Sequence, residues 1–168
     1  MNIHNKDNLL IGIISDTHGL LRPEAVDAMR GADLIIHAGD IGKENILDEL
    51  GAIAPVVAVR GNTDRESWAC KLRSMETLKL NKTLIYVIHD INQLGRDTLL
   101  SHVNVIINGH THRPSVNRHN GVLYVNPGSA GPKRLNLPVS MALLRLKGGA
   151  ADAGIVQLGL SSRLQGPG

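Results

Sequence analysis

Short apolar runs alternate with amphipathic segments through the first two-thirds of this 168-residue chain. That alternation is typical of βαβ units and predicts an α/β fold with a largely parallel sheet. The predicted strands cover residues 9–15, 34–38, 56–59, 76–80, 83–88 and 103–107, and the predicted helices cover residues 22–30, 43–50 and 93–102. Pro23 favours the first helix, because a missing N–H costs little in a first turn.

The last third of the chain has a different pattern, with short apolar runs separated by Gly, Pro and Asn. We expect antiparallel strands at residues 115–118, 122–125, 139–146 and 155–158. A hydrophobic content of 42% is enough for one core of ordinary size. We therefore expect a single domain over residues 1–160, followed by a polar, frayed tail at residues 161–168.

The composition argues against several classes of protein. Charged residues make up 20% of the chain and form no long run of one sign, which is unlike a disordered protein. Lys and Arg number 18 against 15 Asp and Glu, and only 2% of residues are aromatic, so there is no strong nucleic-acid signal. No membrane span and no secretory signal are recognisable, and we expect a cytoplasmic protein. The single Cys70 excludes an internal disulfide and is expected to be buried.

Five of the predicted strands are followed, within about three residues, by a side chain that binds metals or transfers protons. These side chains are Asp16 and His18, Asp40, Asn62, His89, and His110. The carboxyl ends of parallel strands meet at one edge of a sheet, so we expect these residues to converge. Asp and Asn are also common in turns, but histidine is not a turn former and is the commonest metal ligand. The pattern therefore predicts a metal site.

Two pairs of these residues have a spacing of two, Asp16 with His18 and His110 with His112. In extended backbone, that spacing points both side chains of a pair to one side. The full candidate ligand set is Asp16, His18, Asp40, Asn62, His89, His110 and His112. Carboxylate, amide and imidazole without thiolate suit Mn²⁺, Fe²⁺, Zn²⁺ or Ni²⁺ better than Mg²⁺ or copper(I). Seven ligands are too many for one tetrahedral ion, but they fit two ions that share a bridging ligand.

The order of these motifs resembles a known family. Asp16-x-His18, Gly39-Asp40, Gly61-Asn62, His89 and Gly109-His110-Thr111-His112 resemble the five motifs of the calcineurin-like metallophosphoesterases. Asn126-Pro127-Gly128-Ser129 and the short length resemble the small bacterial and archaeal phosphodiesterase branch of that superfamily. The similarity covers about residues 9–146.

The resemblance implies a four-layer α/β/β/α sandwich of two mixed sheets flanked by helices, with two divalent metal ions, Mn²⁺ foremost. By motif position, Asp16, His18 and His112 would hold the first ion, Asn62, His89 and His110 the second, and Asp40 would bridge them. Asp40, Asn62 and His110 are the implied catalytic residues. The implied reaction is hydrolysis of a small phosphoester, most often a diester, by in-line attack of a metal-bridging hydroxide. A homo-oligomer is compatible with this assignment.

Two positions depart from the family pattern. Many relatives have a histidine directly after the Gly-Asn motif, where this chain has Thr63, so the general acid is unassigned. The fourth motif is often His-Gly, but here Asp90 follows His89, which leaves the geometry of that loop open.

Other polar residues near the motifs could have either a functional or a purely structural role. Arg60, Arg65 and Arg113 could pair with a phosphate or lie in solvent. His37 could support the site from behind or simply pack in a strand, and Asn126 to Ser129 could line the cleft or form a turn. The remaining histidines, His4, His102 and His119, are expected to be incidental.

Two alternatives to a phosphodiesterase stay open. One is a protein-interaction scaffold that keeps the fold and has weak or no catalysis, as in the retromer subunit that resembles this family. The other is a metal-dependent hydrolase of a different ester, because phosphate specificity rests on family analogy alone. The intact ligand set argues against the scaffold, since a scaffold does not need four histidines at strand ends.

Overall fold

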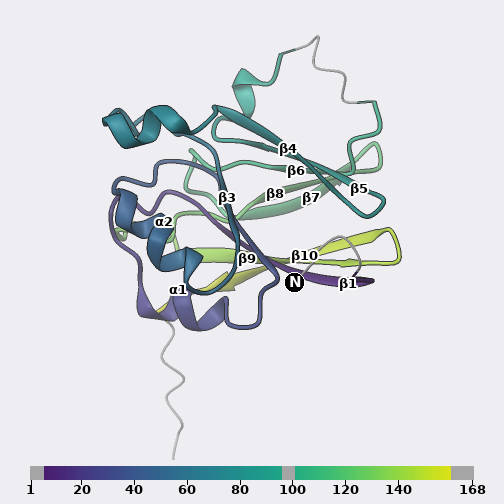
Figure 1. Cartoon of the computed structure of the whole chain (residues 1–168), viewed down its shortest axis with the longest axis horizontal. Coiled ribbons are helices and arrows are strands. Elements are labelled where there is room, and N and C mark those ends of the chain that lie inside the picture. Colours follow the sequence, from purple (N-terminus) through teal and green to yellow (C-terminus); the bar gives the residue numbers. More distant parts are fainter. Residues whose placement is uncertain (1–5, 96–100, 160–168) are drawn as a thin grey trace, which may run out of the picture.

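The computed structural model describes residues 6–95 and 101–159, which form two five-stranded sheets (Figure 1). The first sheet contains, in spatial order, β10 (Ala150–Gln157), β9 (Ser140–Lys147), β1 (Asn8–Ile14), β2 (Leu34–His37) and β3 (Val56–Ala58). The second contains β4 (Met75–Leu80), β5 (Thr83–Ile88), β6 (Val105–Ile107), β8 (Val122–Asn126) and β7 (Ser115–His119). The predicted strands are all present, with bounds that differ by a few residues.

Both sheets are mixed, as predicted. In the first, β1, β2 and β3 are parallel, and β9 is antiparallel to both β1 and β10. In the second, β5, β6 and β8 are parallel, while β4 and β7 pair antiparallel with the strands beside them. The strands after residue 113 are therefore antiparallel to one another as expected, but β8 also pairs in parallel with β6. Among these parallel strands, β1, β2, β3, β5 and β6 bring the five carboxyl ends that carry predicted ligands to one side of the molecule.

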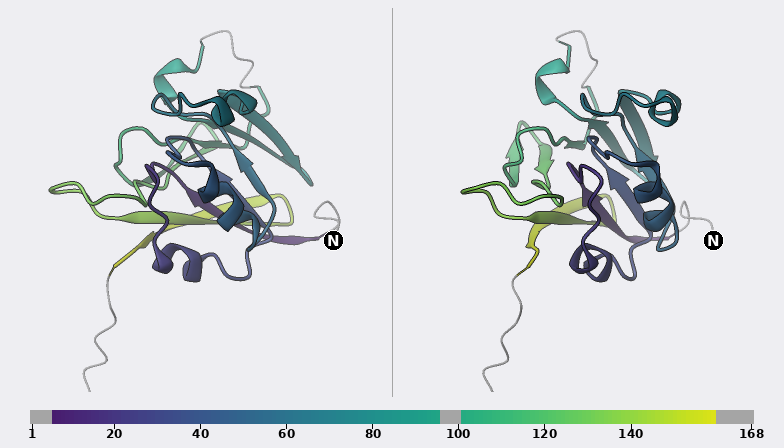
Figure 2. Two further views of the ribbon diagram at one scale, coloured as in Figure 1. Left: turned by 60° about the vertical axis from the view of Figure 1, so that its left-hand side comes forward. Right: turned by 90° about the vertical axis from the view of Figure 1, so that its left-hand side faces the viewer.

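The main core lies between the two sheets. Ile11 and Ile13 of β1 pack in one cluster with Ile85 and Val87 of β5, and all four are fully buried. A second apolar cluster covers the other face of the first sheet, where α1 (Pro23–Ala28) and α2 (Glu44–Gly51) lie (Figure 2). No helix in the described ranges is long and apolar enough to cross a membrane.

The structure differs from the sequence predictions at three places. The predicted helix at residues 93–102 is represented by a short 3₁₀ turn, η3 (Ile91–Gln93), and much of it lies outside the described residues. Another 3₁₀ turn, η2 (Ser67–Lys71), was not predicted. Cys70 in η2 is exposed, so the prediction that it is buried is wrong. His4 and the predicted tail at residues 161–168 also lie outside the described residues.

Within the described ranges, the α-helices cover the first sheet only, and no α-helix packs on the outer face of the second sheet. Ile106 on this face is nevertheless fully buried, with Tyr86 and Tyr124 beside it in register. Three layers of the predicted sandwich are thus formed by regular elements.

Candidate metal centre

The loops beyond β1, β2, β3, β5 and β6 bring all seven predicted ligands together. Each of the seven has an oxygen or ring nitrogen that could bind a metal within 3.9 Å of such an atom of another. They divide into two halves, named here the inner set (Asp16, His18, His112) and the outer set (Asn62, His89, His110), with Asp40 between them. Asn62 and His110 are exposed, whereas Asp16 and His112 are buried, so the outer set is the half that faces solvent.

The inner set is centred on one oxygen of Asp16. Asp16 Oδ1 lies 3.1 Å from His112 Nε2 and 3.8 Å from His18 Nε2. The other oxygen, Oδ2, accepts hydrogen bonds from Ser15 Oγ at 2.6 Å and from the His110 backbone N–H at 3.1 Å. One oxygen of Asp16 therefore fastens the loop, and the other is free to bind an ion.

The outer set is centred on His89. Its Nδ1 lies 2.7 Å from the Ala38 carbonyl, so this nitrogen carries the proton and donates. In the neutral ring, Nε2 then carries a lone pair, and it faces Asn62 Oδ1 at 3.0 Å and Asp40 Oδ2 at 3.3 Å. His110 Nδ1 approaches the same Asn62 oxygen at 3.2 Å. In the protonated His89 ring, Nε2 instead donates a hydrogen bond to these oxygens, whereas the neutral ring presents a lone pair that can bind a cation in the same place.

Asp40 connects the two sets. Its Oδ1 accepts a hydrogen bond from the Thr63 backbone N–H at 2.9 Å, and its Oδ2 lies 3.9 Å from His18 Nε2 as well as beside His89. Burial raises the pKa of Asp40, but the hydrogen bonds from His89 and Thr63 outweigh burial and hold the pKa well below its usual range. Asp40 is therefore ionised, as a metal ligand must be.

The histidine pKa values differ between the sets. Burial lowers the pKa of His89, but Asp40 and the Ala38 carbonyl outweigh burial and raise it. At His112, burial is the largest influence and lowers the pKa, which favours the neutral imidazole that binds metals.

Buried atoms without partners test whether the site fits metal ions. In the described part of the chain, Asp16 Oδ1, His18 Nε2 and His112 Nδ1 are buried and have no hydrogen-bond partner. Buried polar atoms are rarely left unsatisfied, because burial without a partner costs roughly 1–3 kcal/mol each. The ligand atoms of Asp16, His18 and His112, and those of Asp16, Asp40 and His89, all lie within 4.8 Å of one another. The residues present therefore fit divalent cations, and Asp16 belongs to both groups.

The backbone of the site is strained. Five of the seven residues have a positive φ: Asp16 (54°), His18 (44°), Asp40 (54°), His110 (69°) and His112 (61°). The prediction that extended backbone orients the two pairs is therefore wrong, and left-handed turns do so instead. Such turns are unfavourable for residues other than glycine and occur where the surroundings enforce them, often at functional sites. Here the first two loops are joined by hydrogen bonds from Asp16 N to Gly39 O and from His18 N to Asp40 O, each of 3.0 Å.

Comparison with known proteins agrees with this geometry. Residues 9–149 match the sequence profile of the calcineurin-like phosphoesterase superfamily domain. A probable metallophosphoesterase of Methanothermobacter thermautotrophicus is 40% identical over 162 residues, which cover 90% of this chain and 94% of that protein. The chain belongs to the calcineurin-like phosphoesterase superfamily. Proteins of this superfamily bind divalent metals.

More distant relatives include one protein named as an enzyme and one named for vacuolar protein sorting. Phosphodiesterase YfcE of Escherichia coli K12 is 29% identical over 155 residues, which cover 77% of this chain and 84% of that protein. The structure of vacuolar protein sorting 29 from Cryptosporidium parvum superposes with a TM-score of 0.71 at 17% identity, covering 90% of this chain and 98% of that one. That likeness confirms the calcineurin-like fold with its two mixed sheets.

Asp64 is a structural residue of this calcineurin-like centre that the sequence analysis missed. Its buried carboxylate accepts three backbone N–H groups, from Ile41 at 3.2 Å, Gly42 at 3.0 Å and Gly61 at 2.9 Å. These groups belong to the loops that carry Asp40 and Asn62, so Asp64 fixes one loop relative to the other. An aspartate soon after the Gly-Asn motif was the available signal, but its partners cannot be read from the sequence.

His37 supports the centre from behind, which was one of its two predicted roles. The Gly39 N–H donates to His37 Nδ1 at 3.2 Å, so the proton is on Nε2, which donates to Thr17 Oγ1 at 2.9 Å. Thr17 in turn donates to the Ile41 carbonyl at 2.8 Å. The ring and the hydroxyl thus connect the loops that carry Asp16 and Asp40. Burial and the nearby His89 lower the pKa of His37 to about 3.

This buried histidine predicts a pH dependence of stability. Because the pKa is about 3 in the folded state and about 6.5 when unfolded, the unfolded chain binds the extra proton as the pH falls below 6.5. We expect His37 to remove about 2 kcal/mol of unfolding free energy between pH 7 and pH 5. Urea unfolding of His37→Leu should therefore depend less on pH than that of the native chain. His119→Leu, at an exposed position, is the control, and equal pH dependence in all three proteins would contradict the assignment.

The segment from Asn126 to Ser129 packs under the ligand loops rather than forming an exposed turn. The Asn126 amide donates to the Gly109 carbonyl and to Thr111 Oγ1, both at 3.0 Å, and Ser129 Oγ donates to the Asp16 carbonyl at 3.0 Å. All four residues of the segment are buried. The segment therefore holds the inner set in place from below.

Gly61 is required by a close approach. A Cβ at this position would overlap both the backbone nitrogen and the Oδ1 atom of Asp40. We expect Gly61→Ala to displace Asp40, to lower the free energy of unfolding by about 1–3 kcal/mol and to weaken Mn²⁺ binding. Gly51→Ala is the matched control, because no heavy atom lies within 4 Å of that added Cβ. Urea unfolding and Mn²⁺ titration compare the two, and equal effects would contradict the proposed packing.

The two residues that depart from the family pattern both lie against the predicted ligands. Thr63 uses its backbone N–H to bind Asp40, and Asp90 places a carboxylate oxygen 3.9 Å from His110 Nε2. The candidate cations Arg60, Arg65 and Arg113 are all exposed, as are His102 and His119.

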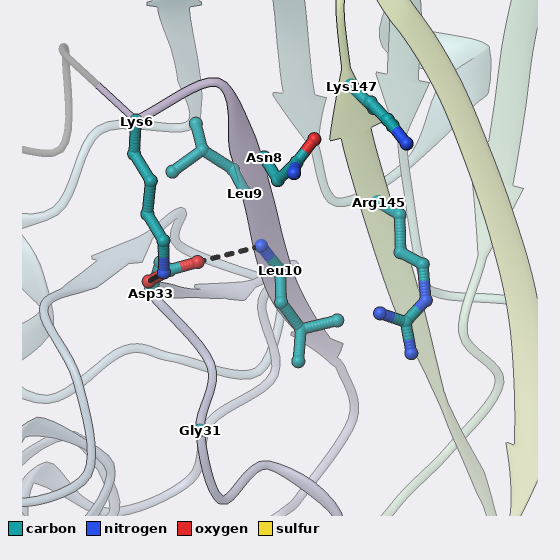
Figure 3. A pocket seen from close by; sticks show the side chains of 8 residues that line it. All are labelled: Lys6, Asn8, Leu9, Leu10, Gly31, Asp33, Arg145 and Lys147. Carbon is teal, nitrogen blue, oxygen red and sulfur yellow. Dashed lines mark hydrogen bonds and ion pairs between the residues drawn. The ribbon is translucent and has the colours of Figure 1, made fainter.

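A separate cavity of about 370 Å³ lies at the amino end of β1, the end opposite the metal centre (Figure 3). Its lining includes Arg145 and Lys147, while Asp33 is already paired with Lys6 and accepts the Leu10 N–H at 2.9 Å. None of the seven predicted ligands lines this cavity, so it is not part of the site.

Proposed function

We propose that this chain is a dinuclear metal-dependent phosphodiesterase. The observation that carries the proposal is the convergence of seven side chains that can bind metals, with Asp16 Oδ1 and His18 Nε2 buried and without a hydrogen-bond partner among the described residues. The inner set would hold one ion, the outer set the other, and Asp40 would contact both. The donor set favours Mn²⁺, with Fe²⁺, Zn²⁺ or Ni²⁺ as alternatives. When bound, such ions supply an activated water and neutralise charge on phosphoryl oxygens.

The protein's own contribution is to hold these groups in place. In Asp16 and Asp40, one carboxylate oxygen accepts hydrogen bonds that hold the loops, and the other oxygen would bind a metal ion. Ala38 and Asp90 lie at the far nitrogens of His89 and His110, and the Ala38 bond fixes the His89 tautomer. Because Asn62 and His110 are exposed, a phosphoester from solvent reaches the outer set first, which agrees with their predicted catalytic roles.

No protein group is assigned to protonate the leaving alcohol. The residue after Asn62 is Thr63, whose hydroxyl is not acidic, where many relatives have histidine. We therefore expect esters with good leaving groups, such as p-nitrophenolate, to be cleaved much faster than dialkyl phosphates. The family relative named as a phosphodiesterase supports a phosphodiester as the substrate.

The test is hydrolysis of bis(p-nitrophenyl) phosphate with and without added Mn²⁺. We expect turnover that requires the metal, that stops in excess EDTA, and that returns when Mn²⁺ is restored. Circular dichroism should change little with EDTA, because the two sheets form a core without the ion. Turnover that persists in EDTA would contradict the proposal. Inactivity toward every ester and metal tested would favour the scaffold, which the likeness to vacuolar protein sorting 29 keeps as the second candidate.

A further inference from the structure

A small cavity opens beside the outer set. It has a volume of about 180 Å³ and is lined by Arg60, Gly61, Asn62, Ser74, His89 and Gln93. We propose that this cavity binds a second phosphate group of the substrate, with Arg60 as its charged contact. The proposal rests on the proposed function, because Asn62 and His89 are ligands of the metal centre. It names the substrate class as phosphodiesters that carry a further phosphate.

The side chains of Arg60, Ser74 and Gln93 line the cavity without binding to other parts of the described structure. Arg60 follows β3, Ser74 precedes β4, and Gln93 ends η3, so three separate segments meet here. Within residues 6–95 and 101–159, none of these three side chains forms a hydrogen bond or an ion pair. The backbone of Arg60 is fixed by a 2.8 Å hydrogen bond from its N–H to the Arg73 carbonyl. The side chain of Arg73, in contrast, pairs with Glu76 at 4.0 Å.

The donors at this cavity suit a phosphate. A guanidinium binds two phosphate oxygens at once, and a serine hydroxyl and a glutamine amide add further donors. An anion with three terminal oxygens can use all of them, whereas a carboxylate has only two oxygens. The volume is below the roughly 300 Å³ of typical small-molecule sites, so the cavity takes one group of a substrate and not the whole molecule.

The experiment compares three thymidine dinucleotides with Mn²⁺ present: one without a terminal phosphate, one with a 5′-phosphate and one with a 3′-phosphate. We expect the native chain to prefer at least one phosphorylated dinucleotide through a lower KM. We measure that preference as the kcat/KM of the preferred phosphorylated dinucleotide divided by the kcat/KM of the unphosphorylated one. Arg60→Gln should reduce this ratio about tenfold, since a charged hydrogen bond is lost. Arg60→Lys should restore part of the preference. Arg73→Gln is the matched control, because it removes a nearby charge outside the cavity and should leave the ratio unchanged.

Two results would overturn the proposal. One is an Arg60→Gln variant that loses the same factor of kcat/KM on all three dinucleotides, and the other is an equal change of the ratio in Arg73→Gln. If the native chain cleaves none of the three and no other ester, the proposed function fails separately. The same dinucleotides are then titrated calorimetrically with Mn²⁺ present, where a Kd preference lost in Arg60→Gln supports the cavity and equal Kd values overturn it.

Discussion

Asp40→Asn is expected to lower the turnover of bis(p-nitrophenyl) phosphate by roughly a thousandfold or more at saturating Mn²⁺. The Oδ2 atom of Asp40 faces both His89 and His18, at 3.3 Å and 3.9 Å, so it lies between the two halves and is the candidate for a shared ligand. An amide removes the negative charge and can place an NH₂ group where a cation would lie. Both ions should therefore bind more weakly, which Mn²⁺ titration would show beside the loss of kcat.

The control for Asp40→Asn is His119→Ala. His119 is exposed in β7, and among the described residues its ring has one hydrogen-bond partner, the neighbouring Asn120. We expect its activity to be within about twofold of the native chain, since surface substitutions have small effects. Equal damage in the two variants, with both folded, would contradict the strand-end assignment. Asp40→Asn with activity near the native level would contradict it as well.

Asp64→Ala is expected to lower the free energy of unfolding by about 3–5 kcal/mol, a large fraction of the total for a domain of this size. The substitution leaves three backbone N–H groups, those of Ile41, Gly42 and Gly61, without their acceptor. In Asp64→Asn, one amide oxygen can still serve Ile41 and Gly61, which share Oδ2, so the loss should be smaller. Urea unfolding followed by circular dichroism measures both variants.

The control for Asp64 is Asp27→Ala. Asp27 near the end of α1 is exposed and pairs at 2.9 Å with Arg30, which follows the helix, and an exposed ion pair of this kind contributes little. Its loss should change the unfolding free energy by less than about 1 kcal/mol. If Asp64→Ala were as mild as Asp27→Ala, Asp64 would not be the residue that joins the two loops.

The sequence predicted which side chains would meet, because the topology makes neighbours of the strand ends. Asp16, Asp40, Asn62 and His89 each follow a strand, and parallel pairing within each sheet, together with packing of the two sheets, brings those ends together. The local backbone was predicted wrongly, because aspartate and histidine adopt left-handed conformations more often than most residues, but still too rarely for residue type alone to predict them. Only long-range contacts, such as Asp16 N to Gly39 O, enforce them.

The residues that support the ligands were harder to predict. Asp64 and Ser15 act through bonds to backbone or to one ligand, and their partners depend on how separate loops meet. The prediction for Cys70 failed because a buried thiol is the commoner case, whereas here the thiol lies on a surface 3₁₀ turn. Amphipathic periodicity at residues 93–102 predicted a helix where the described part shows only η3.

The most direct test of the dinuclear centre is the amount of metal that the native chain binds. The purified protein is stripped with EDTA, saturated with Mn²⁺, desalted and analysed for manganese against protein concentration. Because the ligands form two sets around Asp40, we expect close to two Mn²⁺ ions per chain. A value that stays near one or near zero under saturating Mn²⁺ would contradict the dinuclear centre.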